Sequence, residues 1–168
     1  MSWISELRTL VLGPLRERSD GEWERGPAGK WTPAQIVEHL ALGLEWSAEK
    51  FRARRNHAAM SRRPRTPAEQ IARLFIFGLR WFPPRRKAPE RSVPAPAIGR
   101  AAAEAHFLSG IESWDQLERE LLPARRSDLF VKHPRIGDLT LEEWMRFHLI
   151  HARHHARQIR QRVGRPRT

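Results

Sequence analysis

Apolar residues recur at three- and four-residue steps along most of this chain, with polar residues between them. Such spacing places the apolar side chains on one face of an α-helix. It predicts a first helix over residues 3–18, kinked or broken at Gly13 and Pro14, and a second over about residues 32–56. The stretch 20–30 between them is typical of a turn.

The second half of the chain predicts two further long helices, over about residues 98–122 and 140–163. Capping boxes, in which a hydroxyl residue is followed three positions later by Gln or Glu, support two of the helix starts. These are Thr32 with Gln35, where Pro33 takes the first helical position, and Thr140 with Glu143.

Between the second and third helices the composition changes. Residues 68–82 predict a short apolar helix, and residues 83–97 contain five prolines, which predict a crossing loop. Residues 125–139 indicate another loop, and no stretch shows the two-residue alternation typical of strands. Four long helices without strands predict an all-α fold, a four-helix bundle in a single domain spanning residues 1–168.

The last helix carries a stripe of histidines. At about 100° per residue, Trp144, His148, His155 and Gln158 are among the side chains that fall within about 60° of His151. The opposite side, where charge can remain in water, holds Arg146, Arg153, Arg157 and Arg160. The histidine stripe is therefore predicted to face the interior.

Within that stripe, His151 and His155 are one helical turn apart, so their imidazoles can converge on one metal ion. A divalent site with an open position needs a third ligand from elsewhere. His39 is the best candidate, because it lies in the apolar middle of the second helix and shares a face with Trp46. The chain contains no Cys, so its metal chemistry must rest on His and carboxylates.

Other interpretations of the histidines stay open. The same spacing is typical of core histidines held by hydrogen bonds. His148 could be a fourth ligand, a donor behind the ligands, or a side chain packed beside Trp144. His154 lies about 60° from His151, toward the edge of the stripe. The remaining three have the sequence context of surface or loop residues: His57, His106 and His133.

Composition limits the classes of partner. With 40% hydrophobic residues and seven Trp, the 168 residues can form a packed interior. No run approaches the roughly 20 apolar residues that span a bilayer, and the N-terminus does not resemble a secretory signal, so we expect a cytoplasmic protein with no membrane partner. The net charge of +12 would favour nucleic acid, contacted by residues 80–91 and the terminal RQRVGRPRT. Only four of the 31 basic residues are Lys, however, which is the codon bias of a GC-rich genome, and we expect solvated surfaces instead.

Three segments, WTPAQIVEHL, HPRIGDLTLEEW and HLIHARHHARQI, resemble in order and separation the DinB/YfiT-like metalloenzyme superfamily of bacteria. That family has an early-helix His in a W-[ST]-x-x-x-[IVL]-x-x-H-L-like context, and a late H-x3-H followed by Gln three residues later. The positions that match are His39, His151, His155 and Gln158. The likeness covers nearly the whole chain, including the Pro-rich crossing.

This resemblance implies an up-down-down-up four-helix bundle, a three-histidine site for one divalent Zn, Ni or Fe ion, and a homodimer. Some members of the family resemble S-transferases that use bacillithiol or mycothiol, or mycothiol-dependent maleylpyruvate isomerase. The resemblance thus implies a metal-dependent thiol transferase or detoxification enzyme that takes a low-molecular-weight thiol and an electrophilic small molecule. Such a thiol would supply the nucleophile that a chain without Cys lacks.

Two other functions stay open. Metal-assisted hydrolysis would need a carboxylate near the ion as general base, but Glu38, next to His39, points about 100° away around the helix. A non-catalytic bundle that is stabilised by metal and acts in sensing or partner binding would use the same ligands.

Overall fold

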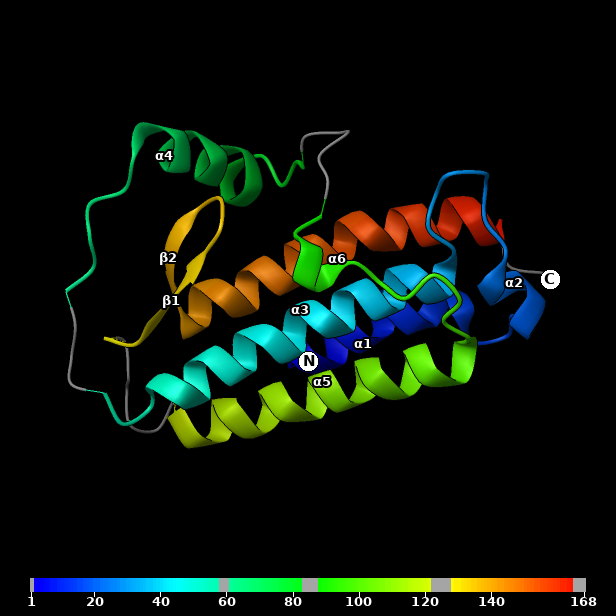
Figure 1. The fold of residues 1–168 in the computed structure, drawn as a ribbon, viewed down its shortest axis with the longest axis horizontal. Coiled ribbons are helices and arrows are strands. Elements are labelled where there is room, and N and C mark those ends of the chain that lie inside the picture. The colour runs from blue at the N-terminus through cyan, green and yellow to red at the C-terminus, as the bar shows by residue number, and fades with distance from the viewer. Residues whose placement is uncertain (1, 58–60, 83–87, 122–127, 165–168) are drawn as a thin grey trace.

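The computed structural model describes residues 2–57, 61–82, 88–121 and 128–164, and this part of the chain is mostly helical (Figure 1). Its four main helices are α1 (Trp3–Leu12), α3 (Pro33–Arg54), α5 (Arg100–Leu121) and α6 (Leu141–Val163). The shorter elements are α2 (Asp20–Glu24), α4 (Pro67–Arg73) and a two-stranded sheet of β1 (Phe130–His133) and β2 (Gly137–Thr140).

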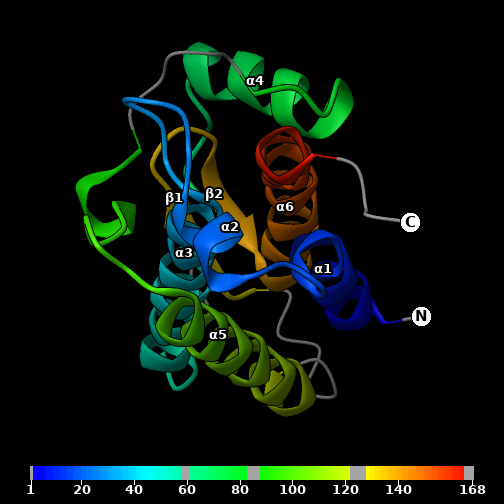
Figure 2. The ribbon, with the colours of Figure 1, turned by 90° about the vertical axis from the view of Figure 1, so that its right-hand side faces the viewer.

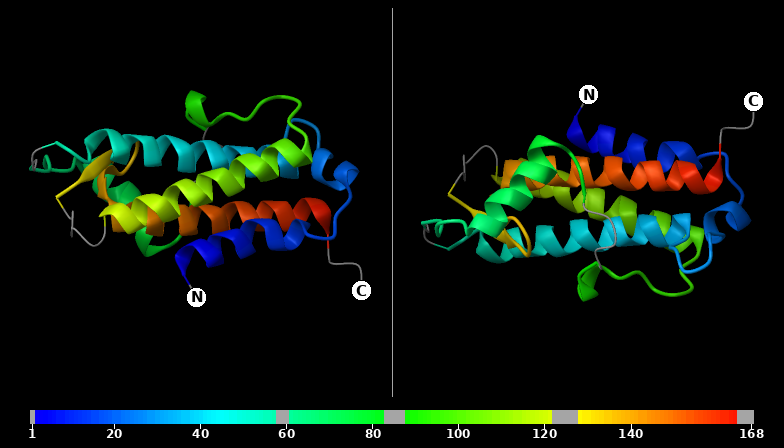
Figure 3. Two further views of the ribbon diagram at one scale, coloured as in Figure 1. Left: turned by 90° about the horizontal axis from the view of Figure 1, so that it is seen from below. Right: turned by 90° about the horizontal axis from the view of Figure 1, so that it is seen from above.

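The four main helices pack side by side around a shared apolar core (Figure 2). α3 packs against α5 and α1 against α6, while α3 also contacts α6 and α1 also contacts α5. α3 and α5 run in one direction and α1 and α6 in the other, as both views in Figure 3 show. The core between them contains large side chains that water does not reach, among them Phe51, Phe107 and Trp114. Burial of this apolar surface stabilises the arrangement.

The starts of α3 and α6 follow from their capping boxes. Thr32 Oγ1 accepts from the Gln35 backbone N–H at 3.2 Å, and the Gln35 side-chain oxygen accepts from the Thr32 backbone N–H at 2.9 Å. Thr140 and Glu143 make the same two bonds at 3.2 and 2.9 Å. These bonds satisfy N–H groups that the first turn of a helix leaves without partners. The predicted starts of both helices are confirmed.

The predicted break of the first helix at Gly13 and Pro14 is confirmed, and its α-helical part is shorter than the predicted 3–18. The α-helix gives way to a 3₁₀ turn, Gly13–Leu15, since Pro14 has no N–H with which to continue the α-helical pattern. The stretch predicted to be a turn then contains α2, whose Trp23 is buried and donates its indole N–H to the Leu15 carbonyl at 3.2 Å. Burial of one aromatic ring therefore orders a segment whose local composition is typical of a turn.

The loop predicted over residues 125–139 contains an antiparallel hairpin, so the prediction of a fold without strands is wrong. β1 pairs with β2, with His133 opposite Gly137 at the turn end. Each strand has four residues, too few for an alternating pattern to be recognised. The hairpin is held against α6, where the Trp144 indole N–H donates to the Val131 carbonyl at 3.0 Å.

The segment between α3 and α5 is less regular. α4 continues into a π-helical turn, Leu74–Gly78, so the helix predicted at residues 68–82 is confirmed over most of its length. In the Pro-rich crossing, residues 88–97 include one 3₁₀ turn, Glu90–Ser92. None of the helices among the described residues combines the length and the apolar character that crossing a bilayer requires.

Some predicted features extend beyond the described residues. Residues 83–87 belong to the predicted crossing loop and basic stretch, residues 122–127 to the end of the third predicted helix and the loop after it, and residues 165–168 to the basic C-terminal segment. These parts of the predictions lie outside what the structure describes.

Candidate metal centre

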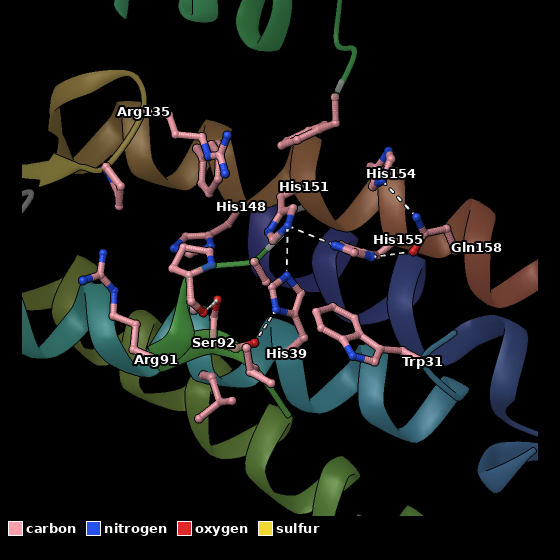
Figure 4. A pocket seen from close by; sticks show the side chains of 18 of the residues that line it. Trp31, His39, Arg91, Ser92, Arg135, His148, His151, His154, His155 and Gln158 are labelled. Carbon is pink, nitrogen blue, oxygen red and sulfur yellow. Dashed lines mark hydrogen bonds between the residues drawn. The ribbon is translucent and has the colours of Figure 1, made fainter. Parts of the chain in front are cut away.

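Three histidine side chains from two helices meet in the interior (Figure 4). His39 lies near the start of α3, and His151 and His155 lie one turn apart on α6. Nε2 of His151 is 3.3 Å from Nε2 of His39 and 3.0 Å from Nε2 of His155. One ligand atom from each histidine lies within 4.8 Å of the other two. The structure thus brings together the three residues that the helical pattern selects as candidate ligands.

Hydrogen bonds behind two of these imidazoles determine which nitrogen faces the centre. The His39 Nδ1–H donates to the Ser92 carbonyl oxygen at 2.6 Å, and the His155 Nδ1–H donates to the Gln158 amide oxygen at 2.9 Å. Because these oxygens only accept, Nδ1 carries the proton in both rings. In each neutral ring, Nε2 then has a lone pair directed at the other histidines. Ligating histidines in metalloproteins are oriented in the same manner.

Burial disfavours the charged form of all three imidazoles. It lowers the pKa of His39, and the hydrogen bond to Ser92 opposes this effect only in part. The pKa values of His151 and His155 fall well below the ordinary histidine range, first because of burial and then because a charge on either ring would repel charge on its neighbours. All three rings are therefore neutral near pH 7.

The donor set fits a divalent metal ion. With Nδ1 protonated in His39 and His155, only His151 can place a proton between the rings, and that proton satisfies one of the two close Nε2 contacts. Because both contacts share His151 Nε2, the other contact then has no proton between its two nitrogens, although they lie at hydrogen-bond distance. A cation would accept all three lone pairs. Imidazole nitrogen suits Zn, Ni and Fe, and three protein ligands leave a coordination position open.

His148 lies beside the three-histidine group, and its ring nitrogen Nε2 contacts the Ser47 hydroxyl. The Ser47 hydroxyl donates to the Gly43 carbonyl at 2.8 Å, so the His148 Nε2–H donates to Ser47 Oγ at 3.0 Å. The His148 ring also packs against Trp144 and Trp114, with centroids 5.4 and 5.2 Å apart. Burial lowers the pKa of His148 to about 3. Of the roles considered for this residue, packing beside Trp144 is the one that the structure contains.

Gln158 connects the cluster to His154. Its amide N–H donates to Nε2 of His154 at 3.1 Å, while its oxygen accepts from His155. His154 is half-buried, and its ring contacts Phe82 with centroids 5.0 Å apart. Since its Nε2 faces Gln158, His154 stands beside the three-histidine group, as its angular position on the helix predicts.

His133 is not the ordinary loop residue that the sequence suggested. It ends β1, and its ring contacts those of Phe147 and Trp144 with centroids 4.5 and 5.3 Å apart. Burial, followed by the charges of Arg135 and Arg91, lowers the pKa of His133 to about 3. Sequence reasoning missed this environment because it depends on the hairpin, which places His133 over the histidine face of α6.

His106 also has specific partners. Its Nδ1 lies 2.9 Å from a Glu38 carboxylate oxygen, and its Nε2 lies 3.2 Å from one of Glu45. His106 is therefore part of the contact between α5 and α3, whereas His57 is exposed as predicted. The position of Glu38 agrees with the helical pattern, because this carboxylate points toward α5 and away from His39.

The arginine face of α6 lies opposite the histidines. Arg146, Arg157 and Arg160 are exposed as predicted. Arg153 departs from the prediction in part, because it is half-buried and its guanidinium pairs with Glu6. The reason is that α1 packs along this side of α6.

The three histidines lie in the wall of a cavity of about 960 Å³. Much of the wall is aromatic: Trp31, Trp46, Trp81, Phe82, Trp144 and Phe147. Its cationic residues are Lys30, Arg91, Arg135 and Arg162. None of the described residues that line it is Asp or Glu. An apolar wall with a few polar groups that converge is typical of a small-molecule site.

Residues 15–162 match the sequence model of a family described as protein of unknown function (DUF1569). The chain belongs to this family. No curated protein and no solved structure matches the chain. The DUF1569 region contains all three clustered histidines and the entire cavity lining, from Gly29 to Arg162, whereas α1 precedes it. Because the family description assigns no activity, function must be argued from the chemistry of the site.

Proposed function

We propose that the chain is a metal-binding protein with the up-down-down-up four-helix bundle of the DinB/YfiT-like superfamily. The opposite directions of the α3–α5 and α1–α6 pairs support this fold. The match of His39, His151, His155 and Gln158 to the motif positions supports the relationship. Helix bundles of this kind commonly build metal sites from side chains on facing helices.

The three converging Nε2 atoms carry the proposal of a metal site. His39, His151 and His155 would hold one divalent ion, Zn, Ni or Fe, through these nitrogens. When bound, an ion with three neutral ligands keeps its full positive charge and supplies a Lewis acid that favours the thiolate form of a thiol. The protein's own part is to orient the rings through Ser92 and Gln158 and to surround them with aromatic side chains.

For the reaction, we propose a thiol-dependent S-transferase or detoxification enzyme. The chain contains no Cys, so the sulfur nucleophile would come from a low-molecular-weight thiol in the cavity. The thiolate would form a bond to carbon of an electrophilic small molecule, whose leaving group departs with the bonding electrons. Hydrolysis is less well supported, because the described cavity lining offers no carboxylate as general base.

Metal content of the purified protein tests the first part of this proposal. We expect about one divalent ion per chain in the wild type and in His57→Ala, since His57 is exposed and outside the cluster. His151→Ala removes the ligand between the other two and should lose most of the metal. Equal metal content in wild type and His151→Ala would disprove the site.

The proposed thiol-transfer reaction is tested with thiols and electrophiles. The metal-loaded protein is assayed with a panel that includes bacillithiol and mycothiol, and consumption of both substrates is followed. We expect turnover that disappears in His151→Ala and in chelator-treated wild type. Absence of metal-dependent turnover, together with a melting temperature that chelation lowers, would instead support a non-catalytic metal-stabilised bundle.

The homodimer implied by the resemblance is a proposal of its own. Analytical ultracentrifugation of the 19.6 kDa chain at several concentrations distinguishes a monomer from a dimer by mass. A species of twice the chain mass would support the dimer, and a single species of the chain mass would rule it out.

A further inference from the structure

Among the residues that the structure describes, the charged side chains around the cavity are all of one sign. The cations are Lys30, Arg91, Arg135 and Arg162, and this part of the lining contributes no Asp or Glu. The histidines in the wall are uncharged near pH 7, because the environment lowers the pKa of every one of them. The cavity is therefore positive even before a metal ion binds, and it favours anionic ligands.

Two of the four cations lie at the same end of the cavity. Arg91 belongs to the 3₁₀ turn Glu90–Ser92, and Arg135 lies in the turn between β1 and β2. Figure 4 shows both on the His148 side of the three-histidine group, away from Gln158. The charges of both arginines also act on His133. Two segments far apart in the sequence thus direct positive charge at one region.

The Arg91 guanidinium is held in a way that leaves its donors available. It stacks over Trp46, 3.9 Å from the ring centroid. Stacking involves the face of the guanidinium group. The N–H groups at its edge can therefore still donate hydrogen bonds. Among the described residues, none provides a carboxylate or another hydrogen-bond acceptor for this side chain. An oxyanion would satisfy these donors with two parallel hydrogen bonds.

His133 supplies another donor to the same end. Its Nδ1 accepts from the Arg135 backbone N–H at 3.1 Å, so the neutral ring carries its proton on Nε2. The Phe147 ring contacts both His133 and His151, with centroid distances of 4.5 and 5.3 Å. This end is therefore one aromatic ring away from the three-histidine group. A small molecule of a few carbon atoms can bridge that span.

We propose that Arg91, Arg135 and His133 form an oxyanion subsite, which binds a carboxylate or phosphate of the small molecule that reaches the three-histidine centre. The inference rests on the proposed function, and it narrows the substrate to an anion whose acidic group lies a few bonds from its metal-binding group. Both oxyanions match the planar fork of a guanidinium. The cavity would then select substrates in two ways: the oxyanion subsite binds their negative charge, and the three-histidine centre binds their metal-binding group.

Two short thiols test this subsite, one ending in a carboxylate and the other in an uncharged hydroxyl group. The cobalt(II)-loaded protein is titrated with 3-mercaptopropionate and with neutral 2-mercaptoethanol, and binding is followed by the sulfur-to-cobalt absorption. In Arg91→Gln we expect the Kd for 3-mercaptopropionate to rise roughly fivefold or more, with little change for 2-mercaptoethanol. The exposed Arg157, outside the cavity lining, provides the matched control Arg157→Gln, which should change neither Kd. Equal changes for both thiols in Arg91→Gln, or none, would overturn the proposal.

Metal-free protein separates failure of the subsite from failure of the metal site. Calorimetric titration with succinate and with inorganic phosphate should show binding that weakens in Arg91→Gln, and the tighter of the two probes identifies the oxyanion. If neither anion binds in an Arg91-dependent manner, the subsite is wrong. If the anions bind but His151→Ala and wild type contain equal metal, the metal site is wrong and the subsite stands.

Discussion

At the scale of single residues, the proton position on each imidazole decides what the cluster can bind. The Nδ1–H of His39 is held by a backbone carbonyl, that of Ser92, and the Nδ1–H of His155 by a side chain, Gln158. Only the second acceptor can be removed by substitution while the backbone stays in place. Gln158 is therefore a positioning residue that acts on the centre through His155.

Replacing Gln158 by Met removes this acceptor and keeps a side chain of similar length. Without the Gln158 amide oxygen, His155 loses the hydrogen bond that selects its tautomer. We therefore expect the affinity of the site for the metal ion to fall 10- to 100-fold. Competition with a chromophoric chelator measures the change. Gln158→Glu retains an acceptor and should restore most of the affinity, while Gln161→Met alters an exposed residue of the same helix and should have no effect. Unchanged affinity in Gln158→Met would refute the positioning role.

His106 offers a residue-scale test that does not involve the metal site. Burial alone would lower the pKa of His106, but the hydrogen bonds and charges of Glu38 and Glu45 outweigh this effect and raise it. A raised folded-state pKa means that the pairing stabilises the fold fully below the unfolded-state pKa near 6.5 and that this stabilisation is lost as pH rises through the folded-state value.

We therefore expect His106→Gln to reduce the free energy of unfolding more at pH 6 than at pH 9. Because the His106 side chain is partly exposed, the difference should be only about 0.5 kcal/mol. Urea denaturation at both pH values measures it, with the exposed His57→Gln as control. The same loss of stability at the two pH values would show that charge on His106 contributes nothing.

A site residue could be predicted from the sequence where its role depends on residue type and spacing within one helix. It could not be predicted where the role depends on a backbone group or on contacts with a distant segment. His151 and His155 are visible because one helical turn separates them, and His39 because it shares the apolar face of its own helix. Ser92 acts through its carbonyl, which every residue has, so its side chain gives no indication of the role. His133 depends on strand pairing, which the local pattern did not show.

At the scale of elements, capping chemistry predicted helix starts well, and short elements were missed. The starts of α3 and α6 are local events that a hydroxyl and an acid or amide three residues later determine. α2 and the β1–β2 hairpin form instead because Trp23 is buried and because Trp144 binds the hairpin backbone. Contacts from distant parts of the chain stabilise these elements, so a local window does not contain their cause.

Gly137 in the hairpin shows how tightly one of these elements is fitted. Its φ is +76°, and a Cβ atom there would lie 3.2 Å from the Glu69 carboxyl carbon. Gly29 has a similar φ of +68°, and a Cβ atom at that position would meet nothing within 4 Å. Substitution of Gly29 therefore isolates the cost of the backbone conformation, whereas substitution of Gly137 adds the cost of crowding Glu69.

We expect Gly29→Ala to destabilise the fold by roughly 1 kcal/mol and Gly137→Ala by more, about 2 kcal/mol or above, because the second also displaces Glu69. Chemical denaturation of both variants measures the difference. Equal costs would indicate that the Glu69 side chain moves aside freely and that the hairpin tolerates the change.

At the scale of the whole molecule, the centre joins helices that are far apart in the sequence. His39 on α3 and His151 on α6 are separated by 112 positions, yet their Nε2 atoms are 3.3 Å apart. Helical periodicity predicted which face of each helix is buried, but it contains no information on which helices are neighbours. The cavity likewise depends on the crossing segment and the hairpin, whose positions are tertiary. A mostly helical fold and three ligand candidates were therefore within reach of the sequence, whereas the cavity was not.

This long-range geometry predicts that metal binding stabilises the entire fold. An ion held by His39, His151 and His155 would link α3 to α6, and a ligand that binds only the folded state stabilises it by about 2.7 kcal/mol at 100 times its Kd. For a chain of this size, that corresponds to a rise in Tm of roughly 5 to 10 °C. Thermal denaturation of chelator-stripped protein, with and without added zinc, measures the shift. It should disappear in His39→Ala and persist in His57→Ala, and a His39→Ala variant that zinc stabilises as much as wild type would show that the ion binds elsewhere.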